Sequence, residues 1–142
     1  MKVCADSSFI APLYIPDSHL REARNRLIQK PDVVVTPLNR SELAHTFQYQ
    51  VFRQRIRPVE AQLAWEAFLN DCSERLWFQV PFPVEVWNLS VSLAAKYGPS
   101  HGIRTLDTLH VACALQLKVE KFWTFDERQA RLAEAAGLDT SA

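Results

Sequence analysis

The chain has 142 residues, 16 basic and 16 acidic side chains and a formal net charge of zero, so bulk charge does not indicate nucleic-acid binding. Its length suits one domain with a hydrophobic core, and its 48% hydrophobic and 23% charged residues are typical of a soluble globular protein. No apolar run approaches the roughly 20 residues of a membrane span, and the first residues offer no signal peptide. We therefore expect one cytoplasmic domain over residues 1–142, with no membrane partner.

The first part of the chain alternates short apolar runs with helical patterns. Residues 2–5 and 33–35 are brief apolar runs typical of buried strands. Apolar residues recur at helical spacing over residues 20–28, which predicts an amphipathic helix between these strands. Thr36 and Pro37 match an N-cap followed by a first-position proline, so a further helix is expected to begin there.

The middle of the chain continues the alternation. Pro58 is expected to start a helix whose apolar face includes Val59 and Leu63. Residues 76–80 form the next apolar run and are predicted to be a strand.

The last part of the chain adds three predicted helices and one strand. Pro83 is expected to start a helix that stops at Gly98. Thr105 is a candidate N-cap for a helix that is apolar nearly all round and therefore central. Residues 122–125 are predicted to be a strand, and a last helix starts at or just after Asp126.

Strands that alternate with helices imply a mainly parallel sheet covered on both faces. We therefore expect an α/β fold with three α/β/α layers around a mainly parallel sheet of four or five strands. Ligands bind such sheets beyond the carboxyl ends of the strands. Four acids from distant segments are predicted to reach this edge, namely Asp6, Glu42, Asp107 and Asp126.

Each acid taken alone has a structural explanation. Asp6, Asp107 and Asp126 could favour helix N-termini, and Glu42 could belong to a capping box with Asn39 if that helix started late. Their convergence needs more than caps, because crowded carboxylates repel one another without a cation. Oxygen ligands favour Mg²⁺ or Mn²⁺, so the four acids are the candidate metal ligands and catalytic residues. An ion held there would activate water and neutralise charge on a phosphodiester.

Three polar residues are candidates for a supporting role. The hydroxyls of Ser8 and Thr124 lie two residues from Asp6 and Asp126, where they could orient carboxylates or simply cap turns. Arg104 precedes the Asp107 helix and is a candidate charge partner of the acids or a phosphate contact.

His110 and Cys113 are three residues apart on the same predicted helix, a spacing that would allow both to bind zinc. Without a second pair of ligands this is weak evidence for a zinc site. The histidine is better interpreted as a hydrogen-bonded core residue than as a catalytic base. The cysteines number three, and this odd count argues against a disulfide framework.

Four segments together resemble the PIN-domain ribonucleases of the VapC toxin type. They are the segment Asp6-Ser7-Ser8, the segment Ser41-Glu42-Leu43, residues 104–112 and residues 124–128. The resemblance runs from Val3 to about Leu138, and its most specific parts are the segment from Arg104 to Ala112 and the triplet that ends at Asp126.

The resemblance implies a Mg²⁺- or Mn²⁺-dependent endoribonuclease that cuts single-stranded or looped RNA. Asp6, Glu42, Asp107 and Asp126 would be the metal-binding acids, supported by Ser8 and Thr124. It also implies a homodimer and a cognate, VapB-like antitoxin protein that inhibits the toxin. We place the antitoxin groove, as a hypothesis, between the helices that carry Leu20 and Leu43, near aromatic residues expected to face outward.

Two other functions are open from the sequence. Asp6 could be the nucleophile of a phosphatase or phospho-acceptor domain, although the scarcity of lysines speaks against this. The chain could also be a non-catalytic PIN scaffold that only binds RNA or protein, which the presence of all four acids disfavours.

Overall fold

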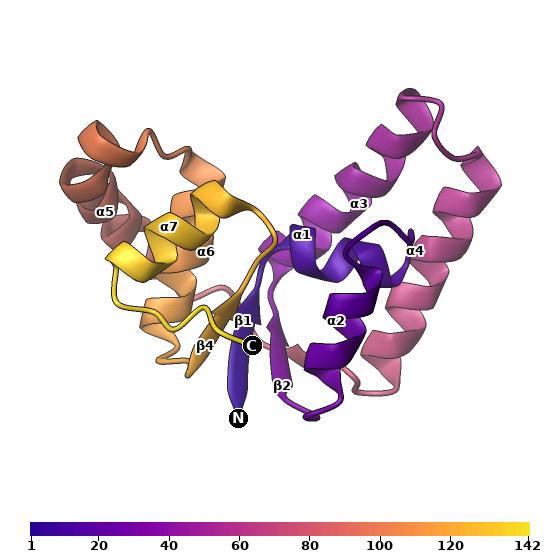
Figure 1. The fold of residues 1–142 in the computed structure, drawn as a ribbon, viewed down its shortest axis with the longest axis horizontal. Coiled ribbons are helices and arrows are strands. Elements are labelled where there is room, and N and C mark those ends of the chain that lie inside the picture. The colour runs from indigo at the N-terminus through magenta and orange to yellow at the C-terminus, as the bar shows by residue number, and fades with distance from the viewer.

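A computed structural model describes residues 1–142 and has a four-stranded sheet with helices on both faces (Figure 1). All strand pairs are parallel, and the strand order is β3-β2-β1-β4. The strands are β1 (Lys2–Ala5), β2 (Asp32–Val35), β3 (Phe78–Gln79) and β4 (Lys121–Trp123). Val3 lies opposite Val33 on one side and Lys121 on the other. The predicted three-layer, mainly parallel α/β fold is therefore confirmed.

The helices fall into two groups along the chain. The first group comprises α1 (Ser7–Ile10), the 3-10 turn η1 (Ala11–Leu13), α2 (Leu20–Leu27), α3 (Pro37–Phe52) and α4 (Pro58–Ser73). The second comprises α5 (Val86–His101), α6 (Thr105–Gln116) and α7 (Glu127–Ala135). None of them is long and apolar enough to span a membrane.

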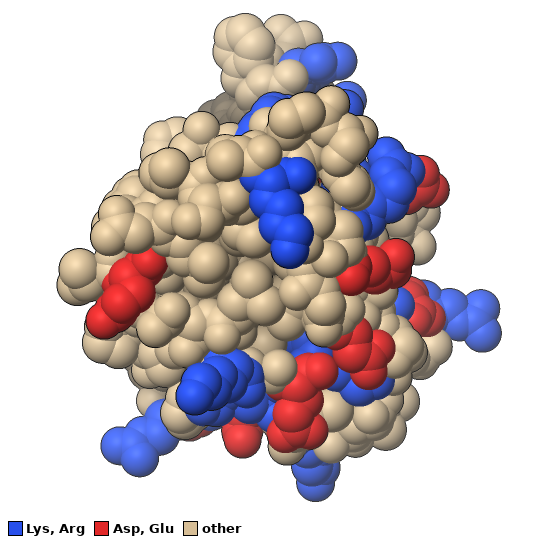
Figure 2. All heavy atoms as spheres, turned by 90° about the vertical axis from the view of Figure 1, so that its left-hand side faces the viewer, with Lys and Arg blue, Asp and Glu red and all other residues tan.

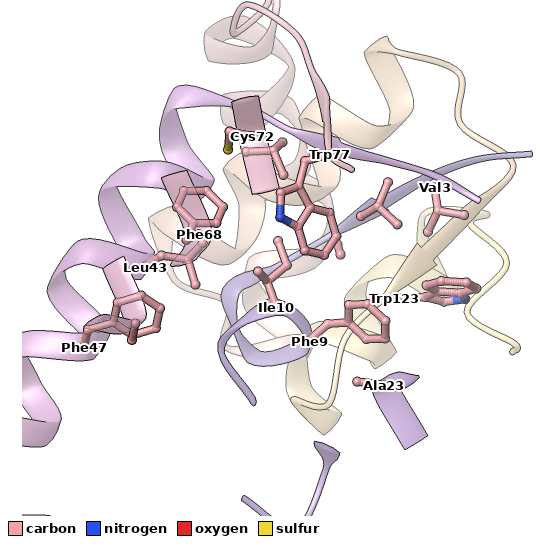
Figure 3. Packing of buried hydrophobic residues seen from close by; sticks show 14 of the residues in the cluster. Val3, Phe9, Ile10, Ala23, Leu43, Phe47, Phe68, Cys72, Trp77 and Trp123 are labelled. Carbon is pink, nitrogen blue, oxygen red and sulfur yellow. The ribbon is translucent and has the colours of Figure 1, made fainter. Parts of the chain in front are cut away.

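Successive side chains of β1 and β2 point to opposite faces of the sheet and so pack alternately against the two groups of helices. Val33 and Val35 pack into the cluster made with α1 to α4, whereas Val34 packs with α5, α6 and α7. Large aromatic residues fill the first cluster, and Figure 3 shows Phe9 between Ile10 and the ring of Trp123. β1, β2 and β4 are buried on both faces, which explains why these strands are continuous apolar runs in the sequence, whereas both residues of β3 are exposed.

The start of α3 is fixed by a capping box and by a contact with β1. Thr36 Oγ1 accepts from the Leu38 and Asn39 backbone N–H groups, while Asn39 Oδ1 accepts from the Thr36 N–H at 2.9 Å. The buried Asn39 amide also donates to the carbonyl of Ala5 at 2.8 Å. The capping box is thus Thr36 with Asn39, so the alternative role of Glu42 in a late capping box is wrong.

Several predicted boundaries and faces are also wrong. The helix expected from Pro83 begins at Val86, and it continues past Gly98 to His101 before Gly102 ends it in a left-handed conformation at φ 58°. Pro99 lies inside the last turn of this helix, where its missing N–H removes one helical hydrogen bond. The cap of α6 is Arg104, not Thr105, which is the first helical residue.

The face predicted for the Pro58 helix is wrong in part. Val59 and Leu63 are exposed, and Ala61 and Ala64 face α3 together with Phe68. Small residues let the two long helices approach each other closely. The strand predicted over residues 76–80 keeps only two ladder residues, and β4 ends at Trp123, so residues 124 and 125 already lie beyond the sheet.

Candidate active site

The four predicted acids line one pocket of about 510 Å³ at the carboxyl ends of β1 and β4. Arg104 and Ser8 line the same pocket, and Thr124 reaches it through a hydrogen bond to Asp6. The other pocket residues were not singled out from the sequence as site residues, and they are Ser7, Ala11, Pro12, Asp17, His19, Thr46, His110 and Phe125.

Asp6 is the most constrained of the acids. It follows β1, caps α1 by accepting from the Phe9 N–H, and is only 8% exposed. Ser8 Oγ donates to its Oδ1, and Thr124 Oγ1 donates to its Oδ2, each at 2.6 Å. Burial raises the pKa of Asp6 above 3.8, because it outweighs these hydroxyl bonds and the nearby His110.

The two hydroxyls also hold the chain that follows β4. Ser8 Oγ accepts from the Phe125 N–H at 2.9 Å, and Thr124 Oγ1 accepts from the Asp126 N–H at 3.0 Å. The first and last strands of the site are therefore joined through side chains at the Asp6 carboxylate. The predicted turn-capping role and the predicted orienting role of these hydroxyls both describe observed bonds.

Glu42 extends from the second turn of α3 to a histidine on α6. Its Oε1 accepts from Ser7 Oγ at 2.7 Å and pairs with His110 Nε2. Burial opposes charge on Glu42, but the hydrogen bond and charge of His110, with the Ser7 bond, hold the pKa of Glu42 below its usual 4.5. Burial likewise lowers the pKa of His110, but Glu42 and Asp6 outweigh it and keep that pKa above 6.5.

Asp107 and Asp126 stand at the starts of two neighbouring helices. Asp107 lies in the first turn of α6, and its Oδ2 accepts from Arg104 Nε at 3.4 Å. Asp126 caps α7 through Oδ1, which accepts from the N–H groups of Arg128 and Gln129. The buried side chain of Gln129 donates to the Asp107 carbonyl at 3.0 Å and so ties the two helix starts together.

The donor set suits a hard divalent cation by chemistry, since four carboxylates from four segments face one pocket. In the arrangement observed, however, no three acids or histidines approach closely enough to hold an ion. Chelation by three carboxylates therefore requires side chains to turn towards one another. His110 is engaged by Glu42, and neither it nor Cys113 belongs to a group of three metal-ligating residues.

Two residues that were not proposed for the site could have been found from their spacing in the sequence. His110 is buried and hydrogen bonded, as predicted for a core residue, but it also lines the pocket because it lies one turn after Asp107 on α6. Gln129 lies three residues after the Asp126 cap, a spacing that indicated the helix start but not the bond to Asp107. Ser7 adjoins Asp6 without any spacing signal that pairs it with Glu42.

Comparison with known proteins supports the fold and the family. A family model described as PIN domain matches residues 3–135. No curated protein matches the chain. The resemblance stated from the sequence motifs is therefore confirmed at the level of the family.

Three solved structures illustrate the likeness in fold. VapC20 of Mycobacterium tuberculosis, a Sarcin-Ricin loop cleaving toxin, has 16% identity and a TM-score of 0.69, with 98% of each chain covered. VapBC2 of Rickettsia felis, solved with a DNA fragment from their promoter, has 14% identity and a TM-score of 0.67, with 99% of this chain and 98% of that chain covered. A toxin-antitoxin complex from Klebsiella pneumoniae has 15% identity and a TM-score of 0.58, with coverage of 87% and 86%.

Proposed function

This chain belongs to the PIN-domain family, and we propose that it is a Mg²⁺- or Mn²⁺-dependent endoribonuclease, the toxin of a toxin-antitoxin pair. The observation that carries the proposal is the convergence of Asp6, Glu42, Asp107 and Asp126 on one pocket from segments far apart in sequence. The VapC and toxin-antitoxin names among its structural neighbours support the same function.

In the proposed reaction, water adds to the phosphorus of an RNA phosphodiester and the bond to the leaving ribose oxygen breaks. The four acids would hold a divalent cation, which when bound would make a water nucleophile available at neutral pH and neutralise phosphate charge. Ser8 and Thr124 orient Asp6, while Ser7 and His110 keep Glu42 ionised. Arg104, whose side chain is 68% exposed, can reach a phosphate at the pocket mouth.

The alternative phospho-acceptor reaction has no observation in its favour. Both oxygens of Asp6 accept hydroxyl hydrogen bonds, and the residue is buried, so neither oxygen is presented as a free nucleophile. A non-catalytic scaffold would not require four carboxylates in one pocket.

The decisive experiment compares two matched substitutions. Asp107→Asn changes one proposed ligand, whereas Asp32→Asn makes the same change at an exposed position at the opposite end of β2. Single-stranded and stem-loop RNAs are incubated with each purified protein in Mg²⁺, in Mn²⁺ or in EDTA, and new 5′ ends are mapped. Cleavage is expected from the parent and Asp32→Asn only with metal. Metal-dependent cleavage by folded Asp107→Asn would overturn the proposed site.

We propose the outer side of α3 as the surface for an antitoxin, in place of the groove between α2 and α3 suggested from the sequence, because the apolar hollow is lined by α3 residues alone. It carries a hollow of about 700 Å³ lined by Tyr49 and Phe52, whose exposed rings stack with centroids 6.2 Å apart. An apolar helix or segment of a partner would cover these rings. A partner that inhibits cleavage in stoichiometric amounts should bind Phe52→Ala more weakly, and unchanged inhibition would exclude this surface.

We assign the proposed homodimer to the face that carries α5. Val84, Trp87 and Val91 are exposed there, with Trp87 and Val91 one helical turn apart. Figure 2 shows this side of the molecule, where few charged side chains interrupt the middle of the face. An apolar patch with few charges can pair with its own copy with little repulsion between like charges. Sedimentation of Val91→Glu should give monomers if the parent is a dimer.

A further inference from the structure

The pocket has an aromatic wall. Phe125 follows β4, and His19 stands at the start of α2, yet their rings stack with centroids 4.4 Å apart and planes 8° from parallel. Both residues line the pocket of the four acids. His19 is exposed, and one face of its ring lies on Phe125.

The stack is held in place by surrounding groups. Phe9 packs against Phe125 at 5.4 Å, and the guanidinium of Arg26 lies 5.8 Å from the Phe125 ring centroid and 5.6 Å from that of Trp123. Arg26 is anchored by Glu22 at 2.9 Å, and its buried Nη1 has no hydrogen-bond partner, so the aromatic faces are its main compensation there. The ring of Phe125 is therefore held in one position by packing on several sides.

The imidazole of His19 takes no part in capping α2. Its backbone N–H donates to Asp17 Oδ1 at 2.7 Å, and its side chain makes no capping bond to α2. The ring is thus free of any role in helix capping. Its place on Phe125, at the rim of the pocket, is the feature that needs a functional explanation.

The local charge selects what this wall can bind. Asp17 and Asp126 flank the two rings, so a phosphate at this position would meet two carboxylates. A nucleobase is planar and uncharged, and bases of single-stranded RNA stack on exposed aromatic side chains. The positively charged Arg104 lines the same pocket beside Asp107, where a phosphate is better accommodated.

We propose that His19 and Phe125 form a stacking subsite for one unpaired nucleobase of the RNA, next to the phosphate that faces the acids. The inference rests on the proposed ribonuclease function and adds to it the position at which the substrate must be unstacked. It also accounts for a preference for single-stranded or looped RNA, because a paired base could not insert beside His19.

The test uses short single-stranded oligoribonucleotides that carry 2-aminopurine at successive positions. This base loses fluorescence when it stacks. Binding is measured with Asp107→Asn in the absence of added metal, so that cleavage does not interfere. We expect quenching at one position of the oligonucleotide. Adding His19→Ala should abolish that quenching and weaken binding on the order of tenfold. Adding His19→Phe instead should keep both the quenching and the affinity. His101→Ala, an imidazole outside the pocket, should bind like its parent.

Two results would overturn the subsite. One is quenching that persists in His19→Ala, and the other is an abasic nucleotide at the quenched position that weakens binding equally with and without His19. A parent that quenches the probe but never cuts RNA would refute the ribonuclease proposal and leave the subsite standing. Cleavage by the parent without any His19-dependent quenching would do the reverse.

Discussion

The hydroxyl of Ser8 is expected to stabilise the fold by an amount that depends on the charge of Asp6. It donates to Asp6 Oδ1 at 2.6 Å and accepts from the Phe125 N–H at 2.9 Å. Because a hydroxyl has one hydrogen, its 3.1 Å contact with Thr124 Oγ1 is not a further bond while both hydroxyls donate to Asp6. Ser8→Ala removes one donor to a buried carboxylate and one backbone acceptor.

The magnitude follows from these two bonds. A hydrogen bond to a charged group contributes about 1.5–3 kcal/mol, against about 1 kcal/mol for a neutral one. Ser8→Ala should therefore lower the free energy of unfolding by about 2 kcal/mol at pH 7. The pKa of Asp6 is raised by burial, so any stability linked to its proton is fully present below 3.8 and lost as pH rises through the folded value. Well below pH 3.8 the carboxyl is protonated in the fold, because its pKa is raised above that value, and the cost should fall to about 1 kcal/mol.

Urea unfolding of the metal-free protein at the two pH values measures this difference. Ser90→Ala is the matched control, since Ser90 is on α5 and its hydroxyl bonds only to the Trp87 carbonyl at 3.0 Å. Its effect should stay within about 0.5 kcal/mol at both pH values. The reasoning is refuted if Ser8→Ala costs no more than Ser90→Ala, or if its cost is the same at pH 3 and pH 7.

Three further predictions concern the metal, the pH and a turn. Mg²⁺ should raise the melting temperature of the parent, by the equivalent of about 2.7 kcal/mol at a hundred times Kd, and thermal scans should show little shift for Asp107→Asn. Because the pKa of His110 is raised, its contribution to the free energy of unfolding is fully present below pH 6.5 and is lost as pH rises through the folded pKa. Because the pKa of Glu42 is lowered, its contribution is present above pH 4.5 and is lost as pH falls through the folded pKa. His110→Gln should therefore flatten the decline of the urea midpoint above pH 6.5; an unchanged decline would contradict it. Gly102→Ala should cost about 1 kcal/mol in the same urea assay because its φ is 58°, and an unchanged midpoint would contradict this.

The topology could be predicted because it depends on local patterns. Brief apolar runs marked the strands, Thr36 with Pro37 marked the start of α3, and Asp126 marked the start of α7. The failures have tertiary causes. Ala61 is buried and Leu63 exposed because α4 packs closely on α3, which helical spacing alone does not reveal.

The candidate site divides in the same way. The edge of the sheet to which the acids belong follows from chain order, and all four line the pocket found there. The bond between Ser7 and Glu42 joins residues 35 apart, and its existence depends on how α1 and α3 pack against β1. The stack of His19 on Phe125 likewise depends on where a loop meets the end of another strand.

The hydrogen bonds at the four acids indicate which one would move most easily if the proposed cation bound. Asp6 has two hydroxyl donors, Glu42 has Ser7 and His110, and Asp126 caps α7. The only partner of the Asp107 carboxylate is Arg104, whose Nε lies 3.4 Å from Oδ2 and whose side chain is largely exposed. Such a pair contributes about 0–1 kcal/mol to stability. Turning Asp107 into the pocket therefore costs the least free energy. The same rotation releases Arg104 from its carboxylate partner, so that binding of the cation and exposure of a guanidinium to the RNA phosphate would be coupled.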